Sequence, residues 1–104
     1  MVNIVKNNLD AIIQTCKELQ VSSLYLFGSA TREKDFNQES DLDFLYSFKK
    51  DETGLPQTTY DYFDLLFRLE KILDKKVDLV AEERILNKYF LETVNKEKVK
   101  LYEA

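Results

Sequence analysis

Two aspartates separated by one residue, Asp41 and Asp43, are the feature of the sequence that points most directly to chemistry. They open the run DLDFLYSF, whose alternation predicts a strand with both carboxylates on one face, about 7 Å apart along the backbone. Both could reach one hard cation, and Mg²⁺ is usually held by one or two carboxylates, phosphate oxygens and water. The chain contains no histidine, so any metal here must have oxygen ligands. The alternative is that these acids only solvate the start of a strand.

Two further positions add to this pair. Gly28 and Ser29 follow the apolar run SLYLF, and a glycine between a strand and a helix lets a phosphate approach the backbone N–H groups. Ser29 is expected to cap the following helix through its hydroxyl. Asp78, within VDLVA, supplies a third carboxylate on a predicted strand. Taken singly, the glycine could make only a turn and Asp78 could be only a polar residue at a strand end.

Hydrophobic periodicity places these residues on alternating helices and strands. Apolar residues at three- and four-residue steps predict a helix over residues 3–20 and another reaching Asp74, the second opened by a capping box in Thr58-Thr59-Tyr60-Asp61. Residues 49–57, which include Gly54 and Pro56, form a loop. The other predicted elements are strands at 23–27, 41–48 and 77–81, a short helix at 29–36, helical turns at 83–95 and an edge strand at 99–102. An α/β (α+β) domain follows from this order.

The three chemical features occur in an order that resembles a known family. The segment LFGSATREKDFNQESDLDFLYSF, residues 26–48, is similar to the signature of the DNA polymerase β superfamily of nucleotidyltransferases, with Ser29 and Asp41 twelve positions apart. KKVDLV, residues 75–80, looks like the segment that carries the third carboxylate of that family. The resemblance extends over nearly the whole chain, which is most similar to the minimal nucleotidyltransferases, or MNT proteins. It implies a small mixed sheet of three to four strands flanked by helices.

The resemblance also implies a role for each carboxylate. Asp41 and Asp43 are expected to bind Mg²⁺, and Asp78 to complete a site for a second ion and accept the proton of an attacking hydroxyl. The substrate is expected to be ATP or another nucleoside triphosphate. All three aspartates are therefore candidate catalytic residues and candidate metal ligands.

The phosphate loop of this chain departs from the family pattern at one position. Gly28 and Ser29 are expected to hold the β- and γ-phosphates, with Arg32 as a candidate added nucleotide contact, although a solvated charge on the helix face is the slightly favoured interpretation of Arg32. The family commonly has Gly-Ser-x-Ala-Arg-Gly, whereas this chain has Gly-Ser-Ala-Thr-Arg-Glu. Glu33 thus brings an acidic group close to the loop, which bears on turnover more than on fold.

Length and composition limit the kinds of protein in which this chemistry could occur. A chain of 104 residues predicts a single domain, 1–104, without a second domain that chooses the substrate. The net charge of −4 disfavours a long nucleic acid as a sole partner. Cys16 is the only cysteine, so no intrachain disulfide can form, and no apolar run is long enough for a signal peptide or a membrane span. We expect a cytoplasmic protein, and a homo-oligomer is compatible with the sequence.

Three functions fit these observations. The first is a Mg²⁺-dependent nucleotidyltransferase that moves a nucleoside monophosphate, AMP from ATP in the family pattern, to an acceptor hydroxyl. The resemblance places such an enzyme as the antitoxin of a pair with a small helical HEPN-type protein. The second is a non-catalytic antitoxin that neutralises such a partner by binding it. The third is a generic α/β domain with an accidental acidic strand.

Overall fold

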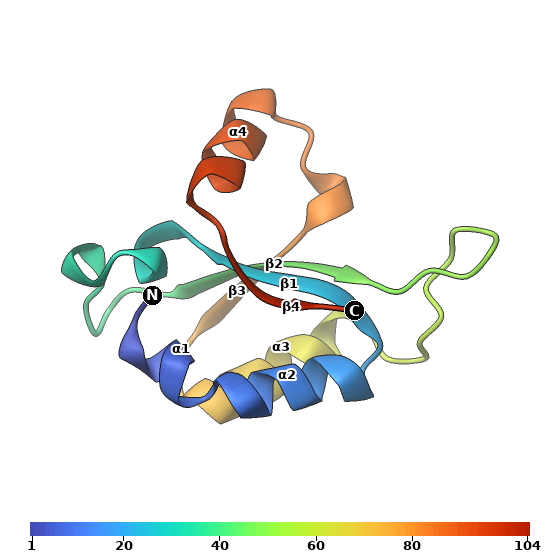
Figure 1. Ribbon diagram of the computed structural model, residues 1–104, viewed down its shortest axis with the longest axis horizontal. Helices are drawn as coiled ribbons and strands as arrows, with labels where there is room; N and C mark the ends of the chain where they lie inside the picture. Colours follow the sequence, from blue (N-terminus) through green and yellow to red (C-terminus); the bar gives the residue numbers. More distant parts are fainter.

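A four-stranded mixed sheet is the centre of the molecule, which is described by a computed structural model covering residues 1–104 apart from the side chain of Glu33. Figure 1 shows helices on both faces of the sheet. The strand order is β3-β2-β1-β4, so β3 and β4 form the two edges. The strands are β1 (Val21–Phe27), β2 (Leu42–Phe48), β3 (Val77–Ala81) and β4 (Val99–Glu103). The four predicted strands are confirmed, with β1 beginning two residues earlier than expected.

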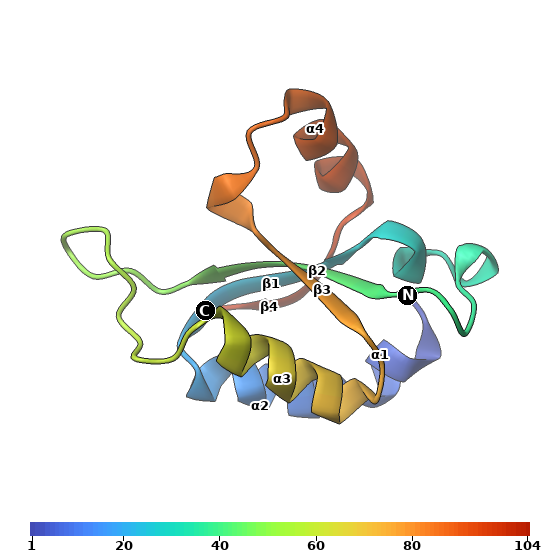
Figure 2. The same ribbon diagram turned by 180° about the vertical axis from the view of Figure 1, so that it is seen from behind.

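Strand direction follows from the connections. β1 pairs antiparallel with both β2 and β4, whereas β2 and β3 are parallel. Parallel neighbours require a crossover, and α3 (Tyr62–Leu73) provides it between β2 and β3. The same crossover places α3 on one face of the sheet, beside α2 (Leu9–Glu18), as Figure 2 shows from behind.

The face covered by α2 and α3 carries the main hydrophobic core. Ile12, Leu24, Phe44 and Leu69 are all fully buried there. These residues come from α2, β1, β2 and α3, because the apolar stripe of each helix and one side of each strand point to the same layer. The Cys16 thiol lies in this layer, and burial raises its pKa to about 12, so the thiol is protonated at neutral pH.

Two predicted helix boundaries were wrong. The helix expected over residues 3–20 is divided into α1 (Asn3–Asn7) and α2, because Asn8 leaves the helical conformation between them. The Asn8 side chain donates to the Ile4 carbonyl at 2.8 Å. At α3 the capping box uses Asp61 and Asp64 rather than Thr58, so this helix begins at Tyr62. In both cases a short polar side chain that bonds to the nearby backbone sets the boundary.

The other face of the sheet carries much less structure. The predicted helix at 29–36 consists of two 3₁₀ turns, η1 (Gly28–Thr31) and η2 (Glu33–Asp35). The helical turns expected at 83–95 are η3 (Glu82–Arg84) and α4 (Lys88–Glu97), and α4 stands above the sheet in Figures 1 and 2. A small buried cluster of Phe27, Leu45 and Val94 joins α4 to the strands. Among the described residues, no helix has the length and apolar character that crossing a membrane requires.

Candidate active site

The strand registers bring together three of the features predicted from the sequence. Phe27 of β1 is the register partner of Asp43 of β2, and Asp43 is the register partner of Asp78 of β3. Neighbouring strands are about 4.8 Å apart, so Asp43 and Asp78 lie side by side across the sheet, and Gly28, which follows Phe27, extends this row on the β1 side, next to the Asp43 carboxylate. The row lies on the face that carries α4, since Leu45, two residues after Asp43, packs against Val94.

Close approach explains the glycine at the end of β1. Gly28 has a φ of +74°, a conformation that other residues rarely adopt. A Cβ atom at this position would lie 2.4 Å from Oδ2 of Asp43, which is closer than two non-bonded atoms can come. The absent side chain therefore creates the space that the Asp43 carboxylate occupies beside the loop.

The loop after Gly28 is held by its own chain and by the N-terminal segment. The Thr31 hydroxyl donates to the Gly28 carbonyl at 2.8 Å, and the Val2 N–H donates to the Ala30 carbonyl at 3.0 Å. The expectation that Ser29 caps a helix was wrong, because η1 begins at Gly28 and Phe27, without a side-chain bond, stands at the cap position. Ser29 is half-buried within the turn.

Partial burial and neighbouring carboxylates together shape the electrostatics of the row. The pKa of Asp43 is raised to about 6, first because the group is partly buried, then because of the charge of Asp78 and a hydrogen bond with it. The charges of Asp41 and Glu97 raise it further. A cation placed here would relieve this repulsion. The oxygen-only donor set fits Mg²⁺, which is the ion expected from the sequence.

The protein supplies only part of a coordination shell. Among the described residues, no three or more His, Cys, Asp or Glu side chains are gathered closely enough to hold a metal ion by themselves. Mg²⁺ usually keeps several waters and takes substrate phosphates as ligands, so a row with few protein ligands is compatible with it. Asp41 stands just before β2 and lies 3.9 Å from the Lys76 ammonium, and its side chain is about a third exposed (35%).

Arg32 connects the loop to α4. Its Nε donates to an Asp35 oxygen at 2.5 Å and its Nη1 donates to a Glu97 oxygen at 2.7 Å. The two carboxylates raise the pKa of the guanidinium, with Glu97 contributing most. Sequence reasoning missed Glu97, which lies 65 positions from Arg32 and carries no local motif. Only the return of the chain from β3 through α4 to β4 brings it to the site.

The sequence matches the family described as "Polymerase beta, Nucleotidyltransferase" over residues 10–104. The chain belongs to this nucleotidyltransferase family. The family match agrees with the geometry of the site. Gly28 directly follows β1, and β1 lies next to β2, which carries Asp43, while β2 lies next to β3, which carries Asp78. The generic α/β domain with an accidental acidic strand is thereby excluded.

Relatives and solved structures extend this result. A candidate protein adenylyltransferase of Methanocaldococcus jannaschii is 37% identical over 78 residues, which cover 75% of this chain and 74% of that protein. The structure of a candidate minimal nucleotidyltransferase superposes with a TM-score of 0.70 at 24% identity, covering 91% of this chain and 90% of the other.

Toxin–antitoxin complexes are among the similar structures, and two of them bear on the chemistry. One contains AMP-PNP and matches with a TM-score of 0.66 and 22% identity, covering 93% and 74% of the two chains. The other holds a tri-AMPylated HEPN toxin of Shewanella oneidensis with its MNT antitoxin, with a TM-score of 0.60, 22% identity and coverage of 95% and 72%. At these identities the likeness shows the fold of this nucleotidyltransferase.

The predicted site residues of this nucleotidyltransferase fall into two groups. Gly28, Asp43 and Asp78 form the row, and Asp41 lies close enough for its charge to act on Asp43. Arg32 reaches the loop but is bound to two carboxylates. Their roles as metal ligands and nucleotide contacts stay predictions, and the side chain of Glu33 lies outside the described part of the structure.

Proposed function

We propose that this nucleotidyltransferase transfers AMP from ATP to a hydroxyl group of a partner protein, in a reaction that requires Mg²⁺. The observation that carries the proposal is the row of Gly28, Asp43 and Asp78 across three adjacent strands. It combines a glycine turn at the end of β1 with paired carboxylates, one of them with a raised pKa. The relative with 37% identity, a candidate protein adenylyltransferase, supports a protein as the acceptor.

Each residue of the row has a distinct part in this proposal. Asp41 and Asp43 would hold Mg²⁺, which when bound supplies positive charge for the triphosphate oxygens. The backbone after Gly28 and the Ser29 hydroxyl would bind the β- and γ-phosphates. Asp78 is exposed at its end of the row, so it would orient the acceptor hydroxyl and take its proton.

The transfer itself exchanges one oxygen–phosphorus bond for another. The acceptor oxygen forms a bond to the α-phosphorus while the bond from that phosphorus to the bridging oxygen of the β-phosphate breaks. Pyrophosphate leaves with the bonding electron pair, and the hydroxyl proton passes to the Asp78 carboxylate. Holding the nucleophile in line with the leaving group supplies much of the rate enhancement in such reactions.

We propose a small helical protein of the HEPN type as the acceptor. The matching toxin–antitoxin structures support this choice, since one of them contains an AMPylated HEPN toxin with an MNT antitoxin. The AMP-PNP in another supports ATP as the donor.

The test is co-expression of the chain with the protein encoded next to it, followed by intact-mass measurement and by transfer from labelled ATP with Mg²⁺ in vitro. We expect a mass gain of one or more AMP units on the partner. Asp43→Asn should lower transfer at least about 100-fold, because it removes a charge from the metal and phosphate site. Asp10→Asn is the matched control, since Asp10 is exposed on α2 across the sheet.

Two outcomes would contradict the proposal. Transfer that is unaffected by Asp43→Asn would exclude the assigned site. A stable complex whose partner never gains mass would replace catalysis with neutralisation by binding alone. A loss of transfer in both Asp variants would indicate a general defect, which the unfolding midpoints of the two variants would reveal.

A further inference from the structure

The outer edge of β3 has backbone groups without strand partners. The Leu42 N–H donates to the Lys76 carbonyl at 3.1 Å, and in the parallel register this directs the backbone of Asp78 and Val80 toward β2. The N–H groups of Val77, Leu79 and Ala81 must then point away from the sheet. Among the described residues, only the first has a partner, the Glu70 carboxylate, to which it donates at 3.2 Å. An edge of this kind is a template for another strand.

Asp78 lies on this edge strand. A strand added to β3 would run about 4.8 Å from it, and one of its residues would face Asp78 from the side opposite to Asp43. Side chains at one register point to the same face of a sheet, so a hydroxyl residue at this position would meet the Asp78 carboxylate. This step rests on the proposed function, in which Asp78 takes the acceptor proton.

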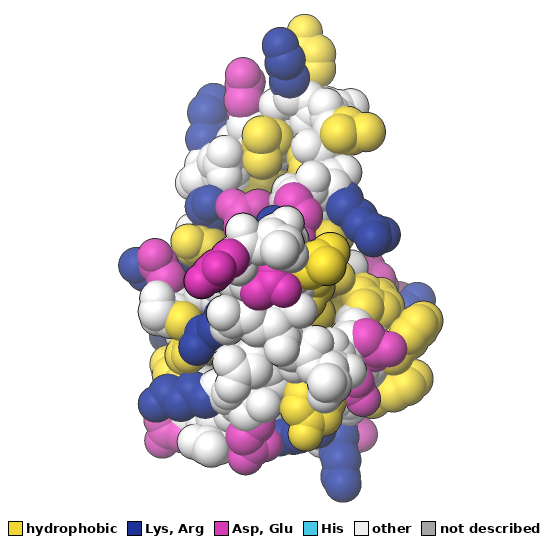
Figure 3. All heavy atoms as spheres, turned by 90° about the vertical axis from the view of Figure 1, so that its right-hand side faces the viewer, with side chains coloured by type: hydrophobic (Ala, Val, Ile, Leu, Met, Phe, Trp, Pro, Cys, Tyr) yellow, Lys and Arg dark blue, Asp and Glu magenta, His cyan; other side chains and the backbone are white. Residues whose placement is uncertain are grey.

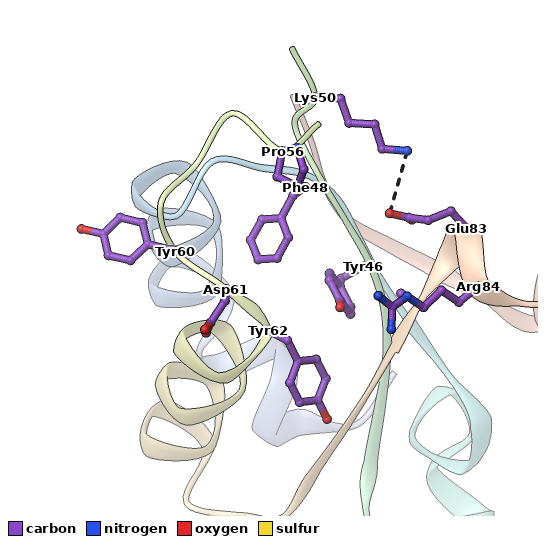
Figure 4. A pocket seen from close by; sticks show the side chains of 10 residues that line it. Tyr46, Phe48, Lys50, Pro56, Tyr60, Asp61, Tyr62, Glu83 and Arg84 are labelled. Atoms are coloured by element: carbon purple, nitrogen blue, oxygen red, sulfur yellow. Dashed lines mark ion pairs between the residues drawn. The ribbon is translucent and has the colours of Figure 1, made fainter. Parts of the chain in front are cut away.

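The residues next to that hydroxyl would point to the other face, where a groove runs between β3 and α3. The groove has a volume of about 510 Å³, and its lining includes Tyr62, Phe63, Leu79 and Arg84. It adjoins the pocket of Figure 4, in which Tyr46, Tyr62 and Arg84 also take part. Figure 3 shows hydrophobic side chains among the charged ones on one face of the molecule. In the groove itself, the side chain of Phe63 is 57% exposed. Apolar residues of an added strand would cover this surface.

Charge distinguishes the two faces of such a strand. On the Asp78 face, Asp43 is acted on by the charges of Asp41, Asp78 and Glu97. Lys76, just before β3, and Val80 flank Asp78 along the chain on this face. Polar side chains are therefore favoured two positions from the hydroxyl residue, on its own face. Apolar side chains are favoured one and three positions away, on the groove face.

We propose that the acceptor protein is recognised through an extended segment that adds to the outer edge of β3, with its reactive hydroxyl residue opposite Asp78 and alternate apolar residues in the groove. A helix presented to the site would leave the N–H groups of Leu79 and Ala81 without partners, whereas an extended segment bonds to them. The register of the added segment against β3 would therefore determine which of its residues is modified.

The first test uses oriented peptide libraries with a fixed central tyrosine, serine or threonine, incubated with the chain, Mg²⁺ and labelled ATP. Modified peptides should be enriched in apolar residues one and three positions from the central hydroxyl residue and in polar residues two positions away. Selection at spacings of three and four would indicate a helical acceptor and overturn the inference, as would the absence of any positional selection.

The second test removes one backbone donor. Ala81 has a φ of −74°, which proline adopts without strain, and its N–H makes no bond within the sheet. Ala81→Pro should lower kcat/KM for the selected peptides at least about tenfold. Ala81→Val adds similar bulk and keeps the N–H, so it should transfer at least about tenfold better than Ala81→Pro. Equal rates for the two variants would overturn the inference.

The outcomes separate the inference from the proposed function. If the wild-type chain modifies neither the partner nor any peptide, the proposed function fails and the inference fails with it. If the wild-type chain modifies peptides without a two-residue pattern, or Ala81→Pro matches Ala81→Val, only edge recognition fails. Should Ala81→Pro not fold, the library pattern of the wild-type chain still decides the question.

Discussion

One face of the sheet carries most of the packing that stabilises the fold, and the other face carries the candidate site. The face under α2 and α3 is a continuous apolar layer in which Phe44, Leu24 and Ile12 are completely buried. The face under α4 has only a small cluster around Leu45, and beside it stand carboxylates that repel one another. Like charges at close range destabilise a fold, so the chain concentrates its packing on the opposite side. A site of this kind requires a core that does not depend on it.

Adjacent residues of β2 allow this difference to be measured, because Phe44 and Asp43 point to opposite faces. Phe44→Ala should lower the free energy of unfolding by about 4 kcal/mol, through lost burial and the cavity left behind. Chemical denaturation followed by circular dichroism measures the change. A cost below about 1 kcal/mol would mean that this face is not the main source of stability.

On the other face, the same measurement should change in the opposite direction. Because the pKa of Asp43 is about 6 in the folded chain and lower in the unfolded chain, the folded state binds the proton more tightly. Stability should therefore fall as the pH rises from about 4 to about 6, and stay low above that. Asp43→Asn removes this penalty and should stabilise the metal-free chain at pH 7 by about 1 kcal/mol, since water screens a half-buried carboxyl.

The control for this prediction is the pH dependence itself. At a pH near 3, where Asp43 is protonated in both states, Asp43→Asn and the wild-type chain should differ little in unfolding free energy. Mg²⁺ with ATP should stabilise the wild-type chain at pH 7 and the variant much less. A variant that is less stable than the wild-type chain at pH 7 would show that the Asp43 charge is already compensated.

Much of this arrangement could be predicted from local sequence patterns. Apolar runs around Leu26, Phe44 and Leu79 predicted the strands, Gly28 predicted a tight turn after the first of them, and the alternation from Asp41 to Phe48 predicted the acidic strand. These patterns are informative because buried strands need continuous or alternating apolar residues whatever the rest of the chain does. Placing Asp78 beside Asp43 further required the topology of the family, which the resemblance supplied.

The remaining features depend on contacts between distant segments or on competing local bonds. Asn8 and Asp61 set helix ends by bonding to nearby backbone groups, and several neighbouring polar residues could have done the same. The space at Gly28 for the Asp43 carboxylate is visible only when β1 and β2 are paired. The contact between Arg32 and Glu97 depends on where α4 returns to the sheet. The last two features have no signal in a single segment.

The smallest expected effects concern the contact between Arg32 and Glu97, at the border of the two regions. The side chain of Arg32 is 45% exposed, so Arg32→Gln should leave the unfolding midpoint nearly unchanged.

Glu97→Gln should raise the affinity for ATP with Mg²⁺ by about threefold, because it removes a negative charge near Asp43 and frees one side of the guanidinium. Arg32→Gln should lower that affinity if the guanidinium meets the nucleotide. Glu92→Gln, exposed on the same helix, is the matched control. Titration calorimetry at two salt concentrations would measure the differences, which should shrink at high salt. If the affinity were unchanged in both Arg32→Gln and Glu97→Gln, this ion pair would only link α4 to the loop and would have no part in nucleotide binding.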